Sequence, residues 1–234
     1  GILVTTYFGP GTTATITNNK ITGNTDGIAV GYDGTDTSSV NASNNNLSDN
    51  DYGIYSTAPV VNATRNWWGT ADSAAVAAYI SGPVIYDPYY DSEGNNTLVH
   101  SKKIYNTTQD IGYDSIQDAI NGATAGDTIT IAAGTYEVNS TIIVNKALTI
   151  SGPGSYGAIV KGTSDNITNV IKIMANNVVL EKLEITHDVF QPYPYPDTTL
   201  TWKEVNHSLV CIPDNSSLSG VIIRNNKFYV PPQS

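Results

Sequence analysis

Apolar and polar residues alternate along residues 1–69, and glycine and asparagine interrupt the alternation. Ala14, Ile16 and Ile21 form one such set, and residues 40–47 repeat its order with Val40, Ala42 and Leu47. A period of two indicates short β-strands rather than helices. The glycines and asparagines between them predict corners, because both residues adopt left-handed backbone conformations at low cost.

The pattern recurs at a fixed distance. Asn19 recurs as Asn45, and Gly27 recurs as Gly53 at the same offset. A repeat of this length is typical of a solenoid, in which each repeat, or coil, adds one layer to a stack. The strands of successive coils would then lie in parallel, about 4.8 Å apart.

Stacked coils place equivalent side chains above one another, and stacked asparagines can form ladders of amide hydrogen bonds. We expect Asn19, Asn45 and Asn66 to form such a ladder, and Asn226 to occupy the same position in a later coil. The alternative is a set of exposed loop asparagines, which the fixed offset of the first two makes less attractive.

Two short helices are predicted, one in each half of the chain. The segment 72–80 is predicted to be a helix with Asp72 as its N-cap, and Gly82-Pro83 ends it. This helix would cover the last coil of the first half. The segment 113–122 is also expected to form a helix, with Asp114 as its cap and Gln117 in a capping-box position, and to lead into a strand at 125–131. A polar linker, 91–96, lies between the two halves.

A second set of coils follows from 141 to 228, with an insertion at 188–202 whose prolines exclude an interior strand. Tyr193, Tyr195 and Trp202 in this insertion are candidates for contact with a glycan or a neighbouring subunit. The alternative is a loop folded over its own coil.

The coil pattern GI-x-V…N-N-x-I-x-x-N, the ending Asn66-Trp67-Trp68-Gly69 and residues 113–134 resemble the pectin-lyase-like right-handed parallel β-helix proteins. The similarity is strongest to the β-helix repeats of archaeal and bacterial surface proteins. It implies an all-β chain with short capping helices in circularly permuted order. Residues 1–92 would be the C-terminal half of a β-helix with its cap, and residues 93–234 the N-terminal half, beginning with a capping helix.

This inverted order leaves an open coil at each end of the chain. When Ser234 is joined to Gly1, the step from Asn226 to Asn19 is one coil long, so the open ends match in register. Three arrangements fit: a covalent tandem array, subunits that complete one another in a filament, and a circularly permuted monomer. The first two are preferred. The absence of an initiating Met suggests a processed, truncated or internal piece of a longer protein.

Composition narrows the possible partners. The net charge of −10 disfavours nucleic acid and anionic membranes, and no segment reaches the roughly 18 apolar residues of a membrane span. The single cysteine, Cys211, lies in an apolar run and is expected to be buried rather than reactive. Nine sequons suit an extracellular, glycosylated surface. They begin at Asn41, Asn46, Asn62, Asn95, Asn106, Asn139, Asn166, Asn206 and Asn215.

The resembled class includes polysaccharide hydrolases, which use pairs of acidic residues. Asn24-Thr25-Asp26-Gly27 resembles a short motif of polygalacturonase-type hydrolases, and Asp49 and Asp51 follow one coil later. The Gly-His-Gly and Arg-x-Lys motifs of those enzymes are missing, and His100, His187 and His207 lie in other contexts. The three aspartates are therefore interpreted as solvated corner residues.

A Ca²⁺ site at Asp33 and Asp36 is a weaker hypothesis than an Asp-Gly turn. Arg65 and Arg224, the only arginines, are expected at outward positions that asparagine occupies in other coils. No cofactor and no metal are therefore predicted.

The sequence thus favours a non-enzymatic structural protein of the cell exterior, a self-associating unit of a filament, sheath, S-layer or adhesin, with cell-surface glycans as further candidate partners. A carbohydrate-active enzyme and a glycan-binding module are the alternatives.

Overall fold

A computed structural model describes residues 1–58, 61–94, 97–164, 167–188, 208–213 and 217–230. The chain is all-β in character, with mostly parallel strands and two short helices in these described ranges. It divides into two compact units, residues 1–102 and 103–234. The boundary lies later than the expected one after residue 92, because the segment 98–99 pairs back onto the first unit.

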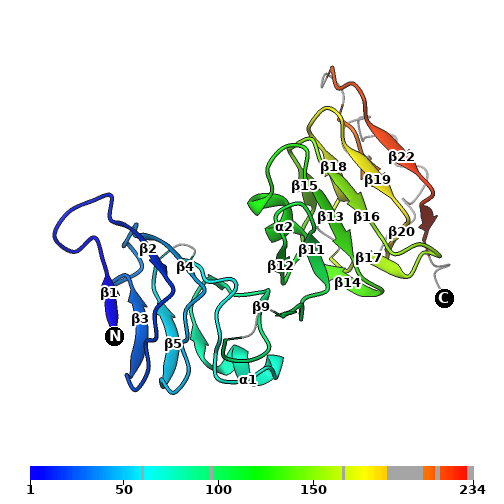
Figure 1. The fold of residues 1–234 in the computed structure, drawn as a ribbon. Helices are drawn as coiled ribbons and strands as arrows, with labels where there is room; N and C mark the ends of the chain where they lie inside the picture. The colour runs from blue at the N-terminus through cyan, green and yellow to red at the C-terminus, as the bar shows by residue number, and fades with distance from the viewer. Residues whose placement is uncertain (59–60, 95–96, 165–166, 189–207, 214–216, 231–234) are drawn as a thin grey trace. The chain divides into compact units, whose positions relative to one another are not determined.

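The first unit contains a four-stranded parallel sheet in the order β1-β3-β5-β7 (Figure 1). Its strands are β1 (Ile2–Val4), β3 (Asp26–Val30), β5 (Tyr52–Ser56) and β7 (Ile80–Ser81). Ile2 pairs with Ile28, Ile28 with Ile54, and Ile54 with Ile80. The period of the sequence is therefore the register of this sheet, and equivalent isoleucines lie in one row.

A second parallel sheet of this unit has the order β2-β4-β6-β8. Its strands are β2 (Thr13–Thr17), β4 (Ser39–Ser43), β6 (Val61–Asn62) and β8 (Val84–Ile85). Between the two sheets, parallel bridges join Lys20 to Asn46 and Asn46 to Trp67. The repeats thus contribute to three rows, and the inward side chains of these rows form a common core.

Trp68 is the largest side chain of this core and is fully buried. It lies against Gly53, where an added Cβ would come 2.8 Å from the indole ring. In the preceding repeat, a Cβ on Gly27 would lie 2.6 Å from the carbonyl oxygen of Gly53. The recurrence of glycine at this position therefore follows from close packing against the next repeat.

Helix α1 (Ser73–Ala78) forms within the predicted segment, with Asp72 as its N-cap, but it ends earlier than expected, because Ile80 belongs to strand β7. The Asp72 carboxylate accepts a hydrogen bond from the Ala75 N–H at 2.8 Å. Val76 is the helix residue buried in the core. Strand β9 (Tyr89–Tyr90) then pairs antiparallel with β10 (Leu98–Val99). The next strand, β11 (Ile104–Asn106), belongs to the second unit.

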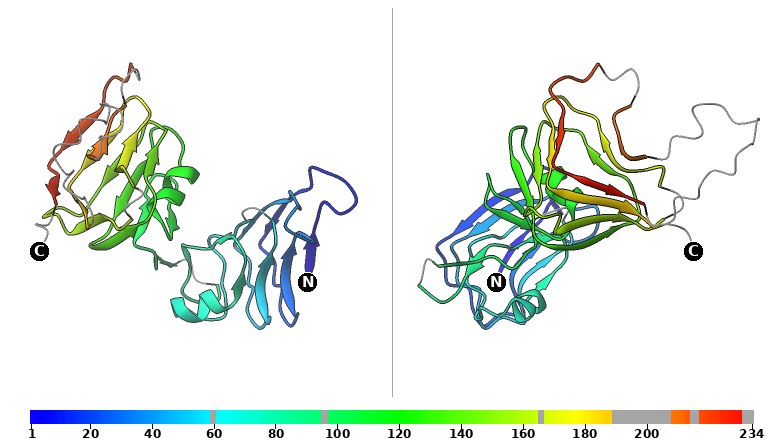
Figure 2. Two further views of the ribbon diagram at one scale, coloured as in Figure 1. Left: turned by 180° about the vertical axis from the view of Figure 1, so that it is seen from behind. Right: turned by 90° about the vertical axis from the view of Figure 1, so that its right-hand side faces the viewer.

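The second unit contains three sheets, and in Figure 2 the strand colours change from green towards orange and red from one strand to the next. Their orders are β12-β11-β13-β16-β19-β22, β14-β17-β20-β23 and β15-β18-β21, and all pairs are parallel except those of β11 with β12 and β13. The bounds are β12 (Ile111–Tyr113), β13 (Thr128–Ile131), β14 (Gly134–Val138), β15 (Ile142–Val144), β16 (Thr149–Ser151), β17 (Ala158–Gly162), β18 (Asn169–Ile173), β19 (Val179–Glu181), β20 (Leu183–His187), β21 (Ser208–Cys211), β22 (Ile222–Arg224) and β23 (Lys227–Tyr229).

Helix α2 (Ile116–Gly122) begins later than expected. Ser115, not Asp114, is the N-cap, and its hydroxyl accepts the Asp118 N–H at 3.0 Å. Gln117 makes no capping box, because its amide bonds to the backbone N–H and C=O of Ile143. At the other end, the Lys146 ammonium donates to three carbonyls at the end of the helix, where a cation is favourable.

No helix in the described ranges is long and apolar enough to cross a membrane.

Replacing Trp68 with alanine should lower the free energy of unfolding by about 3–5 kcal/mol, because a fully buried aromatic ring is lost and a cavity remains. Urea unfolding followed by far-ultraviolet circular dichroism measures the change. Tyr55→Ala, at an exposed position of strand β5, is the control and should cost much less. Equal losses in the two variants would contradict the packing role of Trp68.

Candidate functional site

Asparagine side chains join successive repeats at one corner of the first unit. The Asn45 amide oxygen accepts the Asn19 N–H at 3.0 Å, and its Nδ2 donates to the Ile16 carbonyl at 2.7 Å. One repeat later, Asn66 accepts the Asn45 N–H at 2.9 Å and donates to the Ala42 carbonyl at 2.8 Å. Each asparagine thus satisfies two backbone groups of the preceding repeat, which would otherwise be unpaired at the corner.

The amides also bond to one another along this row. Asn19 Nδ2 donates to Asn45 Oδ1, and Asn45 Nδ2 donates to Asn66 Oδ1, both at 3.1 Å. Asn45 and Asn66 are buried, whereas Asn19 lies exposed at the edge of the stack. The three asparagines expected to stack are therefore brought together by the structure.

The second unit repeats the same geometry at Asn226. Its Oδ1 accepts the Leu183 N–H at 3.0 Å, and its Nδ2 donates to the Leu180 carbonyl at 2.8 Å. The bonded groups of Leu180 and Leu183 are three residues apart along the chain, as are those of Ile16 and Asn19. Because leucine occupies position 183, the amide-to-amide bond of the first unit has no counterpart here.

A left-handed residue precedes every asparagine of this type. The φ angles are 59° at Asn18, 57° at Asn44, 59° at Arg65 and 56° at Asn225. Asparagine adopts this conformation more readily than other residues with a side chain, which explains the Asn-Asn pairs of the sequence. Arg65 replaces the first asparagine of the pair in the same conformation, as the repeats within the sequence predict.

A second row of asparagines was not anticipated as a ladder. Asn50 accepts the Asn24 N–H at 3.0 Å and donates to the Ile21 carbonyl at 2.7 Å. The residues before this pair, Gly23 and Asp49, are also left-handed. The signal was present in the sequence, because Asn24 and Asn50 are separated by the same offset as Asn19 and Asn45.

An open groove of about 590 Å³ lies over the corner with the first asparagine row. Its floor comes from the repeats, and the segment 90–94 forms its wall. The Lys20 ammonium contacts the Glu93 carboxylate at 3.0 Å, and the Asn46 amide donates to the same oxygen at 2.6 Å. The hydrogen bond from Lys20, which has the larger effect, and the one from Asn46 hold the pKa of Glu93 below its ordinary value. The side chains that face the groove include Asn18, Asn44, Lys20, Trp67, Tyr90 and Glu93.

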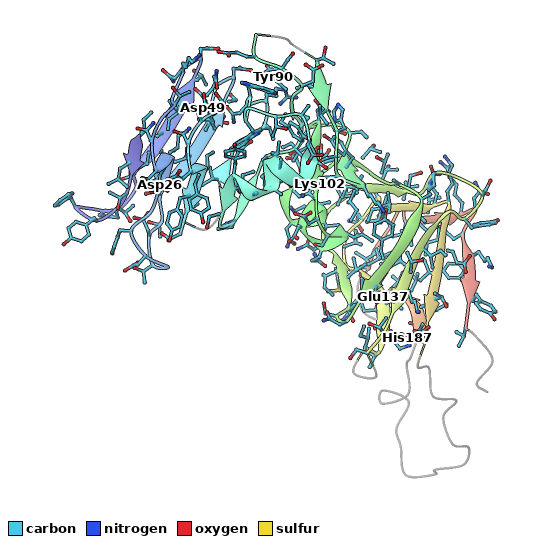
Figure 3. All side chains as sticks on the ribbon, turned by 90° about the horizontal axis from the view of Figure 1, so that it is seen from below. Asp26, Asp49, Tyr90, Lys102, Glu137 and His187 are labelled. Atoms are coloured by element: carbon cyan, nitrogen blue, oxygen red, sulfur yellow. The ribbon has the colours of Figure 1, made fainter. Side chains whose placement is uncertain are left out.

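The aspartates considered for hydrolysis do not form a buried acid pair. Asp26 is half-exposed at the start of β3, and Asp49 and Asp51 are exposed. Figure 3 labels Asp26 and Asp49 and shows them at separate places on the first unit. Asp49 occupies a left-handed corner, where the Ser48 hydroxyl donates to its carboxylate at 3.3 Å. The geometry supports a corner role for Asp49.

The two aspartates considered for Ca²⁺ have separate roles. Asp33 closes a turn, since its Oδ1 accepts both the N–H and the hydroxyl of Thr35 at 2.7 Å. Asp36 is buried, and its carboxylate joins two loops by accepting the Thr5 hydroxyl and the Thr6 and Ser38 N–H groups, each at 2.8 Å. Among the described residues, no cluster of three or more potential metal-ligating side chains is found.

Burial alone would raise the pKa of Asp36, but the hydrogen bonds from Ser38, Thr6 and Thr5 outweigh it and lower the pKa well below its ordinary value. Asp127 of the second unit is similar. Burial opposes ionisation, while bonds from Asn106, Thr124 and Gln109 lower its pKa. Two ionised carboxylates therefore hold loops together, one in each unit.

Arg224 belongs to an ion pair between strands rather than to a ladder position. Its Nε contacts the Glu181 carboxylate at 2.7 Å, and this bond is the main cause that lowers the pKa of Glu181. Residues 224 and 181 are paired across β22 and β19. The expectation that Arg224 occupies an asparagine position of the other coils is therefore wrong, because the left-handed corner equivalent to Arg65 is Asn225 and the ladder position is Asn226.

The histidines occupy unrelated places. His187 is buried at the end of β20 opposite Gly162, and Figure 3 labels it there. His100 lies exposed in the first unit, and His207 is outside the described residues. Cys211, expected to be buried, is only partly so, because β21 is the outer strand of its sheet.

The sequons differ in accessibility. Asn41 and Asn139 are exposed, and Asn62 is half-buried with its oxygen turned to Thr64. Asn46 and Asn106 are buried, and their amide nitrogens donate to Glu93 and Asp127. These last two amides are not available for modification in the folded chain. The remaining sequons, Asn95, Asn166, Asn206 and Asn215, lie outside the described residues, as do Tyr193, Tyr195 and Trp202.

Each unit presents apolar side chains on its outer strands. In β1, Ile2 is 36% exposed, whereas its equivalents Ile28 and Ile54 in the interior strands are fully buried. In the second unit, Ile223 and Phe228 are exposed, while their partners Leu180 and Ile185 are fully buried. Side chains at positions that are buried in the core in the interior strands are therefore exposed to solvent in the outer strands.

Comparisons of the chain with protein-family models, with curated proteins and with solved structures give no match.

Replacing Asn45 with aspartate keeps the shape and the acceptor oxygens but removes the donors to Ile16 and Asn66. Leaving such buried groups unpaired costs about 1–3 kcal/mol each, so the free energy of unfolding should fall by at least about 2 kcal/mol. Urea unfolding at neutral pH measures the change. Asn41→Asp, an identical substitution at an exposed position, should change stability little, and equal effects would contradict the clamp role of Asn45.

Acidification should destabilise the fold through Asp36. Its folded pKa lies below the ordinary 3.8, so its stabilising contribution is complete above that value and is lost as the pH falls further. Asp36→Asn should therefore be less stable than wild type at neutral pH and lose less stability on acidification below about pH 4. Urea midpoints across the pH range test this. The exposed Asp51→Asn control should follow the wild-type curve, and a parallel curve for Asp36→Asn would refute the assignment.

Proposed function

We propose that the chain is a structural unit of an extracellular β-solenoid, and that each of its two units is a segment of right-handed parallel β-helix. Support comes from the parallel register of three rows of repeats and from corner asparagines that clamp each repeat to the one before it. The same corner, a left-handed residue followed by asparagine, occurs in both units. On this proposal the two units contain equivalent coils.

The exposed edges support assembly by addition of further coils. Ile2 on one edge and Ile223 and Phe228 on the other are apolar, and each would become a core residue if another coil stacked on it. Edge strands also carry unpaired backbone groups that template further pairing. Stacking one edge on the other makes a heterologous contact, which does not close on itself and therefore gives a filament or a linear array.

The asparagine clamp predicts the contacts at such a junction. Inside the stack, Asn45 and Asn66 each bond to two backbone groups of the preceding repeat. The side-chain oxygen accepts the N–H of the equivalent asparagine, and the side-chain nitrogen donates to the carbonyl three residues before that asparagine. Asn19 is exposed, and among the described residues its oxygen accepts no hydrogen bond. By the same rule, Asn19 of one copy would accept the Asn226 N–H of the next and donate to the Ile223 carbonyl.

The opposite end of each unit is closed. In the first unit, α1 follows the last repeat and buries Val76 in the core. In the second unit, α2 buries Ile116, Ala119 and Ile120 beside β11 and β12. These closed ends would restrict growth to the two open edges. The accessible sequons Asn41 and Asn139 suit an exterior location of the resulting array.

If this proposal holds, the purified chain should associate in a concentration-dependent way, and Asn19→Asp should weaken the association about tenfold. The substitution removes a hydrogen-bond donor and adds a charge at the junction, which corresponds to about 1.4 kcal/mol. Sedimentation velocity over a dilution series measures the change, with Asn41→Asp as the control of equal charge.

A monomer at all concentrations, in material whose mass excludes a longer chain, would contradict the proposal. Peptide mass spectrometry of native material separates the two forms of array. A peptide that continues from FYVPPQS into GILVTTYF would show a covalent tandem repeat. Its absence, together with association of the intact chain, would leave non-covalent subunits.

A further inference from the structure

We propose that the groove over the first asparagine row, defined by Asn18, Asn44, Lys20, Trp67, Tyr90 and Glu93, binds a neutral oligosaccharide. The six residues that define this site do not include Tyr193, Tyr195 or Trp202, and they do not include Asn19, which lines the same groove and is the residue named at the assembly junction. The proposal does not depend on the assembly model, because all of its residues belong to the first unit.

The floor of the groove is a regular surface. Asn18 and Asn44 occupy equivalent corners of successive repeats, and Lys20, Asn46 and Trp67 form the bridged row beside them. Equivalent positions are spaced about 4.8 Å apart along the stack. A ligand that presents polar groups at regular intervals would match this surface better than a single small ion would.

Two aromatic side chains face the groove. Trp67 is half-exposed, in contrast to the neighbouring Trp68, which is fully buried. Tyr90 is also half-exposed, and its hydroxyl donates to Asn44 Oδ1 at 2.6 Å, which fixes the ring relative to the floor. Aromatic rings with nearby polar groups suit a pyranose, because a sugar ring has an apolar C–H face and a polar rim of hydroxyls.

The charges in the groove compensate each other. The Lys20 ammonium is paired with Glu93 at 3.0 Å, and Glu93 also accepts from Asn46. An anionic ligand would have to compete with Glu93 for Lys20, and the chain carries a net charge of −10. Glu93 is the one carboxylate among the residues that line the groove, and no group of three or more potential metal ligands is found in the described ranges, so the groove is a poor cation site. The groove therefore favours an uncharged polar ligand.

Unused hydrogen-bonding groups are present on the floor. Among the described residues, the Asn18 amide makes no hydrogen bond, and Asn44 uses its oxygen but not its nitrogen. Both side chains are exposed, and the left-handed backbone fixes the direction in which they leave the chain. Such amides can both donate to and accept from sugar hydroxyls. An extended peptide would instead require an open strand edge, whereas backbone groups of this corner are already bonded to the ladder asparagines.

The test is isothermal titration of the whole chain with cellohexaose, mannohexaose and chitohexaose, and with oligogalacturonate as an acidic comparison. We expect binding of at least one neutral hexasaccharide and weaker or no binding of the acidic one. Trp67→Ala should weaken the binding by about tenfold or more, because the stacking surface is lost.

A second variant guards against loss of fold in Trp67→Ala. The double substitution Asn18→Gly with Asn44→Gly removes both amides, while glycine retains the left-handed corners. It should also weaken binding, with an unchanged circular dichroism spectrum. Tyr52→Ala, an exposed aromatic outside the groove, is the matched control and should bind as wild type does.

Three results would overturn the proposal. One is the absence of binding of every neutral oligosaccharide in the panel. Another is binding that survives both the Trp67 and the double asparagine substitutions. The third is binding of extended peptides in place of sugars at the same groove. Assembly is tested separately, by sedimentation of the Asn19 variant in the absence of oligosaccharide.

Discussion

The hydrogen bonds that corner asparagines make to the preceding repeat determine much of this structure. A corner between two strands leaves N–H and C=O groups that neither strand can pair, and burying such groups unpaired is expensive. Asn45, Asn66, Asn50 and Asn226 all solve this problem in the same way, with one oxygen and one nitrogen. Since each side chain reaches one repeat back, the corner and the register of the stack are fixed together.

Much of the fold could be predicted because its elements repeat. The fixed offset of Gly27 from Gly53 is also the register in which Ile28 pairs with Ile54, and the stacking of Asn19, Asn45 and Asn66 was expected from the same pattern. Single elements were less predictable. The N-cap of α2 moved from Asp114 to Ser115, since both residues are good caps and only the backbone conformation selects one. Arg224 was misplaced by one position, because it ends strand β22 and the left-handed corner equivalent to Arg65 is the next residue, Asn225.

The groove could not be predicted from the repeat at all. Its floor is made of repeated positions, but its wall comes from the segment 90–94, which folds back from beyond the last repeat. The ion pair of Lys20 with Glu93 joins two distant parts of the first unit that share no pattern. Trp67 and Trp68 also look equivalent in the sequence, and only the alternation of inward and outward positions separates a core residue from one that faces the groove.

The spacing between equivalent positions is not constant throughout the stack. Val40 pairs with Val61 after a shorter stretch of chain than the one that separates Ala14 from its partner Val40. The difference falls in the loop between β5 and β6, while the corner from β4 through Asn45 to β5 keeps its form. Gene duplication or deletion could therefore lengthen, shorten or trim this protein one layer at a time, provided that every new layer brought its own corner asparagine.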